Sequence, residues 1–339
     1  MIPGKVLFYG GYSVLLKGHI SLSIAVVDKE GKGVSYRWEH GEEKVVSPQF
    51  NIDGLPEGAL VTIAYQTAKE YLSSWGWQET TVYLENSPIF GKPGEKSGLG
   101  SSAAATVATI SALFEAQGYH SYAHVETIHK LSQIAYAKYA KKLGSGFDIA
   151  TSSFRRTIIY RRYDPESVSL ENWKESIHRP WPWLEATPVS LPAQIQVFNI
   201  KGGSTSTISA VKAWKEWKSK EPEAFKELMA RQNEAETKAI EALLSGNWEE
   251  ARKYTHEARK VHQEMQERIS RYVQDFEPIE PPEITRFIEE AEKRYNVIGR
   301  APGAGGRDSV AFLGDRRYPL AEVAKELGLD VEEIEVRMV

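Results

Sequence analysis

Short runs of β-branched and aromatic residues, separated by glycine-containing turns, dominate the first 90 residues of the chain. They cover residues 5–9, 21–28, 33–38 and 80–85, and their length and composition predict β-strands. From Ser102 the residues become small and apolar for four turns, up to Gly118. This pattern predicts a buried helix that is ended by a C-terminal glycine.

Helical and extended patterns alternate through the middle of the chain. We predict a helix at 124–142 and strands at 156–163 and 193–200. The segment 164–192 contains five prolines and several tryptophans. Prolines at this density disfavour regular structure, so the segment marks the expected domain junction.

Residues 221–272 carry a charged, amphipathic pattern that predicts two or three helices, with a break near Ser245 and Gly246. The inner faces of these helices are assigned to Leu228, Ile240, Leu243, Leu244, Trp248 and Val261. The last part of the chain alternates strand, helix and strand. Its final residues, 332–339, predict an edge strand.

Length and composition limit the classes of protein. The 339 residues suit two domains, which we place at 1–190 and 191–339. A net charge of −4 gives no broad basic excess and argues against a nucleic-acid partner. The absence of cysteine excludes disulfides, thiolate nucleophiles and cysteine-based zinc sites. No apolar stretch approaches the ~20 residues that span a bilayer, and the first residues predict a strand rather than a signal peptide. We therefore expect a cytoplasmic protein with no membrane partner.

The most distinctive local feature is the sequence KSGLGSSAA, from Lys96 to Ala104. Gly98 and Gly100 allow the backbone to approach a ligand closely, and the following helix turns its free N–H groups toward the same place. Ser101 and Ser102 can cap the helix or reach phosphate oxygens and Mg²⁺. The segment predicts a phosphate site, although a glycine loop with a serine cap needs no ligand.

Two other nucleotide motifs fit this segment poorly. The string GLGSSA satisfies the loose G-x-G-x-x-G/A pattern, which requires a hydrophobic strand directly before it. The preceding residues, FGKPGEKS, form a polar stretch. No G-x-x-x-x-G-K-[ST] sequence occurs in the chain. A dinucleotide fold and a Walker-type loop are therefore disfavoured.

Four ordered segments together resemble one superfamily. They are PGKVLFYGGYSV at residues 3–14, KSGLGSSAA, KKLGSGFDIA at 141–150 and APGAGGRDSVAF at 301–312. This set, which spans nearly the whole chain, is similar to the motifs of the GHMP kinases. Four motifs in the same order are far harder to obtain by chance than a single glycine loop.

Within that superfamily the details resemble the phosphomevalonate kinase family. Gly10, Gly11 and Tyr12 match its G-G-Y form of the first motif, where mevalonate kinases have G-E-H, and GSGFD is its form of the third. Ala137 stands where mevalonate kinases carry a Mg²⁺-binding glutamate. Arg307 replaces a glycine of the last motif, which leaves the backbone path there open.

The resemblance implies a two-domain α+β fold, with an N-terminal ATP-binding domain like the second domain of ribosomal protein S5 and a ferredoxin-like C-terminal domain. It implies ATP and Mg²⁺, with Lys5 and Asp148 as catalytic residues. An exposed strand-end lysine and an Asx-type turn are their alternative roles. The residues expected to bind ATP are Lys96, Gly98, Leu99, Gly100, Ser101, Ser102 and Ala103, with Ser102 also a metal ligand.

The implied reaction is phosphoryl transfer from ATP to (R)-5-phosphomevalonate in isoprenoid biosynthesis, by a monomer or homodimer. An anionic acceptor needs a clamp of cations and N–H groups. The residues expected in it are Tyr12, Lys96, Ser101, Ser204, Thr205, Ala304, Gly305 and Gly306. The alternative role of Tyr12 is packing, and the alternative for Lys96 is a solvated lysine in a loop. The alternative functions are another GHMP enzyme, such as mevalonate kinase or diphosphomevalonate decarboxylase, and a non-catalytic metabolite sensor.

Overall fold

The computed structural model describes residues 1–91, 97–203 and 206–339. These residues form two compact units, one made of residues 1–6, 23–188 and 339 and the other of 7–22 and 189–338. Strands β1 (Gly4–Tyr9) and β2 (Ile20–Asp28) each contribute residues to both units. The division at residue 190 stays a prediction about domains, and it differs from these units in the placement of residues 7–22.

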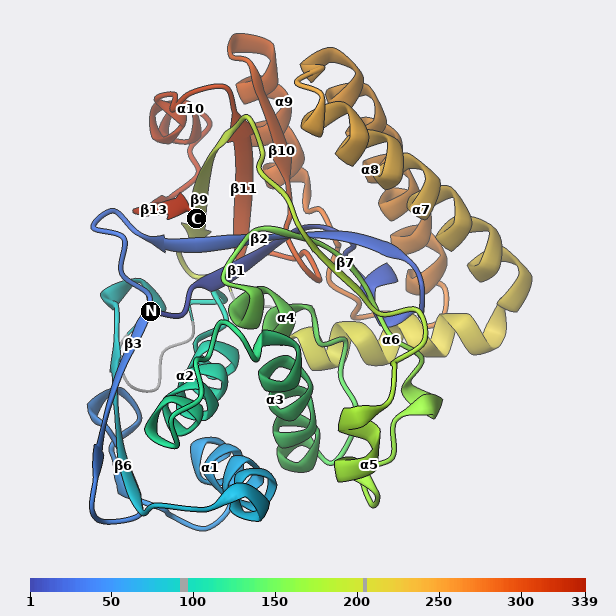
Figure 1. Cartoon of the computed structure of the whole chain (residues 1–339). Coiled ribbons are helices and arrows are strands. Elements are labelled where there is room, and N and C mark those ends of the chain that lie inside the picture. The colour runs from blue at the N-terminus through green and yellow to red at the C-terminus, as the bar shows by residue number, and fades with distance from the viewer. Residues whose placement is uncertain (92–96, 204–205) are drawn as a thin grey trace. The chain divides into compact units, whose positions relative to one another are not determined.

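The first unit combines helices with two groups of strands (Figure 1). One group pairs in the order β1, β2, β7 and β8, and the other in the order β3, β6, β4 and β5. The strands not yet bounded are β3 (Val34–His40), β4 (Lys44–Ser47), β5 (Ile52–Gly54), β6 (Thr80–Asn86), β7 (Ile158–Arg161) and β8 (Glu185–Pro188). The helices are α1 (Leu60–Leu72), α2 (Ser101–Ala116), α3 (Val125–Ala140), α4 (Phe147–Phe154) and α5 (Trp173–His178).

Helix α2 is the centre of this unit. Nearly all of its side chains are buried, because it contacts α1, α3 and α4 as well as strands β3 and β6. Small residues such as Ala104 and Ala108 allow these neighbours to approach closely. The predicted helices at 102–118 and 124–142 are confirmed as α2 and α3. The proline-rich segment holds more regular structure than expected, since it contains α5 and β8.

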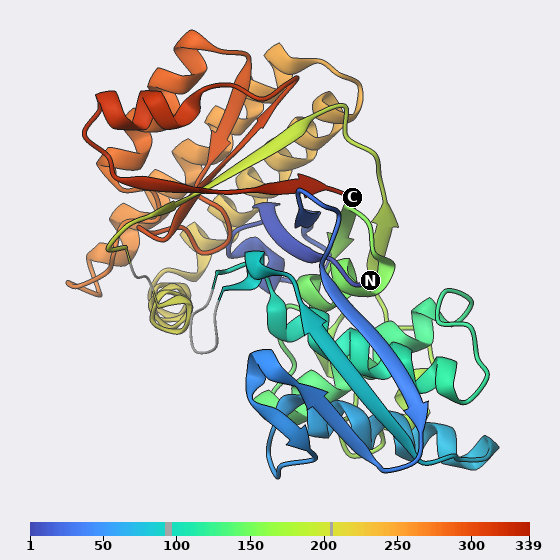
Figure 2. The same cartoon turned by 90° about the vertical axis from the view of Figure 1, so that its left-hand side faces the viewer.

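The second unit contains an antiparallel sheet in the order β10, β11, β9 and β12. Figure 2 shows these strands in yellow-green to red, with helices beside them. The strands are β9 (Gln194–Ile200), β10 (Val297–Arg300), β11 (Ser309–Gly314), β12 (Val331–Ile334) and β13 (Val336–Met338). The helices are α6 (Thr207–Lys220), α7 (Pro222–Leu244), α8 (Trp248–Ser270), α9 (Pro282–Arg294) and α10 (Leu320–Glu326). The edge strand predicted at 332–339 is confirmed only in part, because β12 lies at the end of this sheet order whereas β13 is a separate strand outside it.

Two apolar clusters form the core of the second unit. One lies under the sheet, where the rings of Phe198, Phe287 and Phe312 contact one another edge to face. The other joins Tyr12 to the helices through Trp214 and Trp217. A side chain from the start of the chain is thus part of the core of the C-terminal helices.

Helices α7 and α8 lie side by side as an antiparallel hairpin (Figures 1 and 2). The predicted break near Ser245 and Gly246 is confirmed. Leu228, Ile240, Leu243 and Val261 are buried as expected, but Leu244 is 37% exposed. Successive residues of a helix point about 100° apart, and this rotation carries Leu244 from the buried side of α7 to its exposed side. Among the described residues, no helix has the length and apolar character needed to cross a membrane.

Candidate active site

The first strand of the chain lies directly against the glycine-rich loop. The Lys5 backbone N–H donates to the carbonyl of Leu99 at 2.8 Å, and the Lys5 ammonium donates to the carbonyl of Gly98 at 2.8 Å. A Cβ atom on Gly4 would lie 2.6 Å from the same Leu99 oxygen. Close contact between strand and loop therefore requires a glycine at position 4 and fixes Lys5 beside the loop.

The loop delivers the chain into α2 through a left-handed residue. Gly100 is the N-cap of α2 with φ of 83°, a conformation that favours glycine. The amides of Ser101, Ser102 and Ala103 have no hydrogen-bond acceptor among the described residues. Neither serine caps the helix, so the predicted capping role is wrong and both half-buried hydroxyls remain available. Free amides at a helix start form a ready site for an anion.

Asp148 lies in the first turn of α4, close to Lys5. The helix begins after Gly146, which has φ of 79°, and Asp148 Oδ1 accepts from the Ile149 amide at 2.9 Å. The Lys5 ammonium lies over the ring of the neighbouring Phe147, 5.3 Å from its centroid. Lys5, the glycine loop and Asp148 therefore come together within the first unit.

Burial and Asp148 act on the Lys5 charge in opposite directions. Burial lowers the pKa of Lys5 because it removes water from the ammonium group, while the nearby Asp148 carboxylate raises that pKa. A half-buried ammonium with an aromatic ring on one side interacts strongly with an incoming anion. This arrangement suits a lysine that neutralises negative charge on a bound ligand.

The first and last motifs meet within the second unit. A Cβ atom on Gly11 would lie 2.4 Å from the carbonyl oxygen of Gly303. The Gly303 amide donates to the Leu7 carbonyl at 3.0 Å. Tyr12, with φ of 63°, donates its hydroxyl proton to the Ala304 carbonyl at 2.9 Å. The G-G-Y turn and the last glycine turn thus form one packed structure.

The hydrogen bonds of the last glycine turn leave one amide available. The Gly305 amide donates to Pro302 at 3.1 Å, and the Gly306 amide donates to Ile279 at 2.8 Å. The Ala304 amide has no acceptor within the described ranges. Of the three predicted backbone donors, only that of Ala304 is free to bind an anion without breaking an existing bond.

Arg307 fits this turn without strain. The left-handed residues are Gly303, Gly305 and Gly306, and Arg307 is not among them. Its guanidinium pairs with Glu283 of α9 at 2.9 Å. The Cα of Gly203 packs closely on the Arg307 carbonyl, because a Cβ there would lie 1.8 Å from that oxygen. Gly203 and the last motif are therefore neighbours.

Comparisons with known proteins agree with this geometry. The family model described as the GHMP kinases N-terminal domain matches residues 60–156. A phosphomevalonate kinase from Saccharolobus solfataricus is 30% identical over 341 residues, which cover 98% of this chain and 96% of that protein. The chain belongs to the phosphomevalonate kinase family.

Other members of the family extend the match. A phosphomevalonate kinase from a Streptomyces species is 26% identical over 92% of this chain and 88% of its own. The solved structure of Streptococcus pneumoniae phosphomevalonate kinase in complex with phosphomevalonate and AMPPNP has a TM-score of 0.80 at 18% identity, over 100% of this chain and 98% of that one. The expected α+β fold of the GHMP kinases is confirmed.

Three residues expected in the site of this phosphomevalonate kinase family member lie outside the described residues. They are Lys96, Ser204 and Thr205. Within residues 1–91, 97–203 and 206–339, no group of three acidic or histidine side chains gathers as a metal site. Ala137, at the place of the glutamate in mevalonate kinases, is buried in α3.

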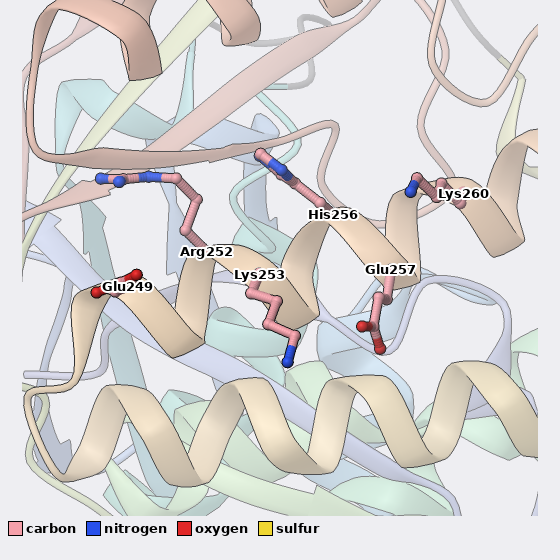
Figure 3. Close-up of a pocket in the computed structure, with 6 residues that line it drawn as sticks. All are labelled: Glu249, Arg252, Lys253, His256, Glu257 and Lys260. Atoms are coloured by element: carbon pink, nitrogen blue, oxygen red, sulfur yellow. The ribbon is translucent and has the colours of Figure 1, made fainter.

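A hollow of a different kind lies along α8. Figure 3 shows Arg252 and His256 pointing to the opposite side of the helix from Lys253 and Glu257. Arg252 donates to Asn296 at 3.0 Å, and His256 pairs with Glu292 at 2.6 Å. These groups have partners on their own unit, and none of the predicted site residues lies there.

Sequence reasoning missed residues that hold Lys5 and the turn of Asp148 in place. Gln133 and His129, behind the turn of Asp148, lie outside the four motif segments, and Phe147, beside Lys5, lies within GSGFD but was given no role of its own. Gln133 is one amide among many polar residues of a helical pattern, and only the folded chain places it at Gly146. The GSGFD motif itself was the available signal for Phe147.

Proposed function

We propose that the protein transfers the γ-phosphoryl group of ATP to the phosphate of (R)-5-phosphomevalonate, giving ADP and 5-diphosphomevalonate. The observation that carries this proposal is the Lys5 ammonium, 2.8 Å from the Gly98 carbonyl, beside a helix start with free amides and in the field of Asp148. Phosphoryl transfer needs positioning and charge neutralisation more than covalent participation. This cluster offers both.

The start of α2 is the proposed phosphate site for ATP. The amides of Ser101, Ser102 and Ala103 supply N–H donors, and the positive end of the helix dipole adds to their attraction for anions. The Ser102 hydroxyl fits a bound Mg²⁺, since it lies at the same helix start and is not used as a cap. A bound Mg²⁺ would neutralise part of the phosphate charge.

Lys5 is proposed to contact the migrating phosphoryl group. Its backbone bond to Leu99 and its ammonium bond to Gly98 fix the side chain beside the loop before any ligand arrives. Pre-positioned charge costs no reorganisation during the reaction, which makes it more effective than a mobile lysine. The ammonium would exchange its carbonyl partner for phosphate oxygens as charge develops there.

Asp148 is proposed to orient Lys5 and the acceptor rather than to act as a strong base. The second pKa of a phosphate monoester is about 6, so the acceptor phosphate is already mostly dianionic at neutral pH. Little deprotonation is then needed. The carboxylate attracts the ammonium of Lys5 and opposes the effect of its burial.

The remaining acceptor contacts are proposed for Tyr12, Lys96, Ser101, Ser204, Thr205 and the turn of Ala304, Gly305 and Gly306. The free Ala304 amide is the backbone donor that supports this best. Tyr12 already gives its only hydroxyl proton to Ala304. While that hydrogen bond is kept, Tyr12 can hold the Ala304 turn in place, or its hydroxyl oxygen can accept a hydrogen bond from the acceptor.

A coupled ADP-release assay tests the proposed function. The purified protein is supplied with Mg-ATP and, in separate reactions, with mevalonate, phosphomevalonate, diphosphomevalonate or galactose. We expect turnover with phosphomevalonate and at least 100-fold lower kcat/KM with the other three, because mevalonate and galactose have no phosphate for the clamp and diphosphomevalonate carries a longer diphosphate in place of the monoester. Turnover only with mevalonate or diphosphomevalonate would assign another GHMP reaction, and ATP binding with no turnover would indicate a sensor.

The proposed assembly and location are tested separately. Size-exclusion chromatography of the same preparation tests whether the protein is a monomer or a homodimer, and cell fractionation tests the proposed cytoplasmic location.

A further inference from the structure

The turn before Asp148 is closed by a side chain from another helix. Gln133, on α3, donates its amide hydrogen to the carbonyl of Gly146 at 2.8 Å. The Gln133 side chain is 4% exposed, and the bond joins residues that are 13 positions apart. Gly146 is the N-cap of α4, so this bond fixes the helix end from which Asp148 projects.

The Gln133 amide occupies the space that a side chain at position 146 would need. A Cβ atom on Gly146 would lie 2.5 Å from both the nitrogen and the oxygen of the Gln133 amide. A glycine at position 146 therefore meets two needs. Its positive φ allows the sharp entry into α4, and its lack of a Cβ allows the Gln133 amide to approach closely. The Tyr160 hydroxyl donates a second hydrogen bond to this turn, to the carbonyl of the neighbouring Ser145 at 2.7 Å.

His129 completes the arrangement one turn earlier on α3. Its Nε2 atom lies 3.0 Å from the Gln133 amide nitrogen. Burial lowers the pKa of His129 to about 3, and the neighbouring Lys130 charge acts in the same direction. The imidazole is therefore neutral at physiological pH, and Nε2 can accept the second amide hydrogen of Gln133.

The same histidine also contacts the far end of α4. Its ring lies 5.7 Å from that of Phe154, the last residue of the helix, and 6.4 Å from that of Trp181. Together, His129 and Gln133 contact both ends of the short helix that carries Asp148. An eight-residue helix has little stability of its own, so its position depends on such contacts.

We infer that Gln133 is a positioning residue for Asp148, and that neutral His129 holds the Gln133 amide in the orientation that bonds to Gly146. This inference rests on the proposed function, in which Asp148 orients Lys5 and the acceptor. Both amide hydrogens of Gln133 are used, one on Gly146 and one on His129. The side-chain shape alone does not supply these bonds.

The test compares Gln133→Met, which keeps the shape and removes the donors, with Ile134→Val as a control. Ile134 is a fully buried residue of α3, and its replacement by valine also reduces the packing stability of the helix. In Gln133→Met we expect kcat with phosphomevalonate to fall about 10- to 100-fold, with KM for ATP changed less than about 2-fold. Ile134→Val should stay within about 2-fold of the unmodified protein in both.

A double-variant cycle separates positioning from general damage. In an Asp148→Asn background the further effect of Gln133→Met on kcat should shrink to less than about 3-fold, because residues acting as one unit are not additive. A full 10- to 100-fold loss in that background would overturn the inference. So would an unchanged kcat in Gln133→Met alone.

A second measurement does not depend on turnover. The pKa of Lys5, read from the pH dependence of its modification by an amine reagent, is expected to move downward in both Gln133→Met and Asp148→Asn, and to stay unchanged in Ile134→Val. An unmoved Lys5 pKa in Gln133→Met would overturn the inference. If the protein does not turn over phosphomevalonate, the proposed function is wrong, and the pKa of Lys5 alone then decides whether Gln133 positions Asp148. If Gln133→Met does not fold, His129→Leu and His129→Gln give the same test. We expect kcat to fall only in His129→Leu, because glutamine can still accept the Gln133 amide hydrogen and leucine cannot.

Discussion

Lys5 allows a pH test at the scale of one residue. Burial lowers its pKa, and Asp148 raises it, so we expect kcat to fall on the alkaline side at a lower pH than a solvent-exposed lysine would give. Asp148→Asn removes the carboxylate charge and should move this alkaline limb to still lower pH. The acid limb should lie near pH ~6, where the acceptor phosphate gains a proton, and should be the same in both proteins. Rate profiles between pH 5 and 10 measure both limbs.

Lys5→Met is the control for that profile. We expect it to lose the alkaline limb and about 10²- to 10³-fold in kcat, as expected for removal of a pre-positioned charge. Because the folded pKa of Lys5 is lowered, the protonated group destabilises the fold at neutral pH, and this cost disappears as pH rises above the unfolded pKa. The free energy of unfolding of Lys5→Met at pH 7 should therefore not decrease. An alkaline limb that survives in Lys5→Met would assign it to another group.

At the scale of elements, the two ends of α2 provide a matched pair of glycines. Gly100 at the start has φ of 83°, and Gly118 just past the end has φ of 86°. Alanine at either position should cost about 1–2 kcal/mol of stability, because both require the left-handed conformation. A Cβ at Gly100 would also lie 3.0 Å from Lys5 Cε, whereas at Gly118 it meets nothing within 4 Å. Thermal unfolding should show similar losses, and the ADP-release assay should show a loss of at least 10-fold only in Gly100→Ala. Equal activity in the two variants would argue against α2 as the phosphate site.

Helix α2 also illustrates what the sequence predicts well at this scale. Its apolar run and its terminal glycine indicated the helix and both ends within two residues, because these signals are local. Capping by Ser101 or Ser102 was predicted wrongly, since the left-handed Gly100 occupies the N-cap in its place. Leu244 was placed inside by the amphipathic pattern, but it is 37% exposed at the end of α7.

The candidate site shows the same limit. Lys5 and Asp148 were found through motif resemblance, and in the folded chain the Asp148 carboxylate lies near enough to raise the pKa of Lys5. Gln133 was not found, because its bond to Gly146 depends on how α3 and α4 pack. A contact between two helices leaves no pattern in either helix that a single sequence can reveal.

At the scale of the whole molecule, the course of residues 7–22 is the feature that a linear reading missed. They belong to the second unit together with 189–338. The Gln232 side chain donates to the Gly11 carbonyl at 2.9 Å, the Ile20 amide donates to Asn233 at 2.8 Å, and the Tyr9 and Thr255 hydroxyls lie 2.6 Å apart. These partners are more than 200 positions away, so a boundary drawn from local composition cannot include them.

A buried ion pair makes this discontinuity testable. Arg300 and Glu236 of the second unit lie 3.0 Å apart, with exposures of 2% and 0%. Arg300→Met leaves a buried carboxylate without its partner, which should cost about 3–5 kcal/mol. Arg294, whose partly exposed guanidinium pairs with Glu290 and Glu326, is the control, because Arg294→Met should cost at most about 1 kcal/mol. Hydrogen exchange followed by mass spectrometry locates the loss of protection along the chain.

In Arg300→Met we expect peptides from 7–22 to exchange faster together with those from 189–338, while peptides from 60–156 keep their protection. The reason is that residues 7–22 are stabilised by side chains of α7 and α8, and so lose protection when those helices open. Because residues 7–9 continue the strand that carries Lys5, the variant should also lose activity at temperatures where 60–156 is still folded. Faster exchange spread evenly over the chain would mean that the two units unfold as one, and protected 7–22 peptides would place that segment with the first unit instead.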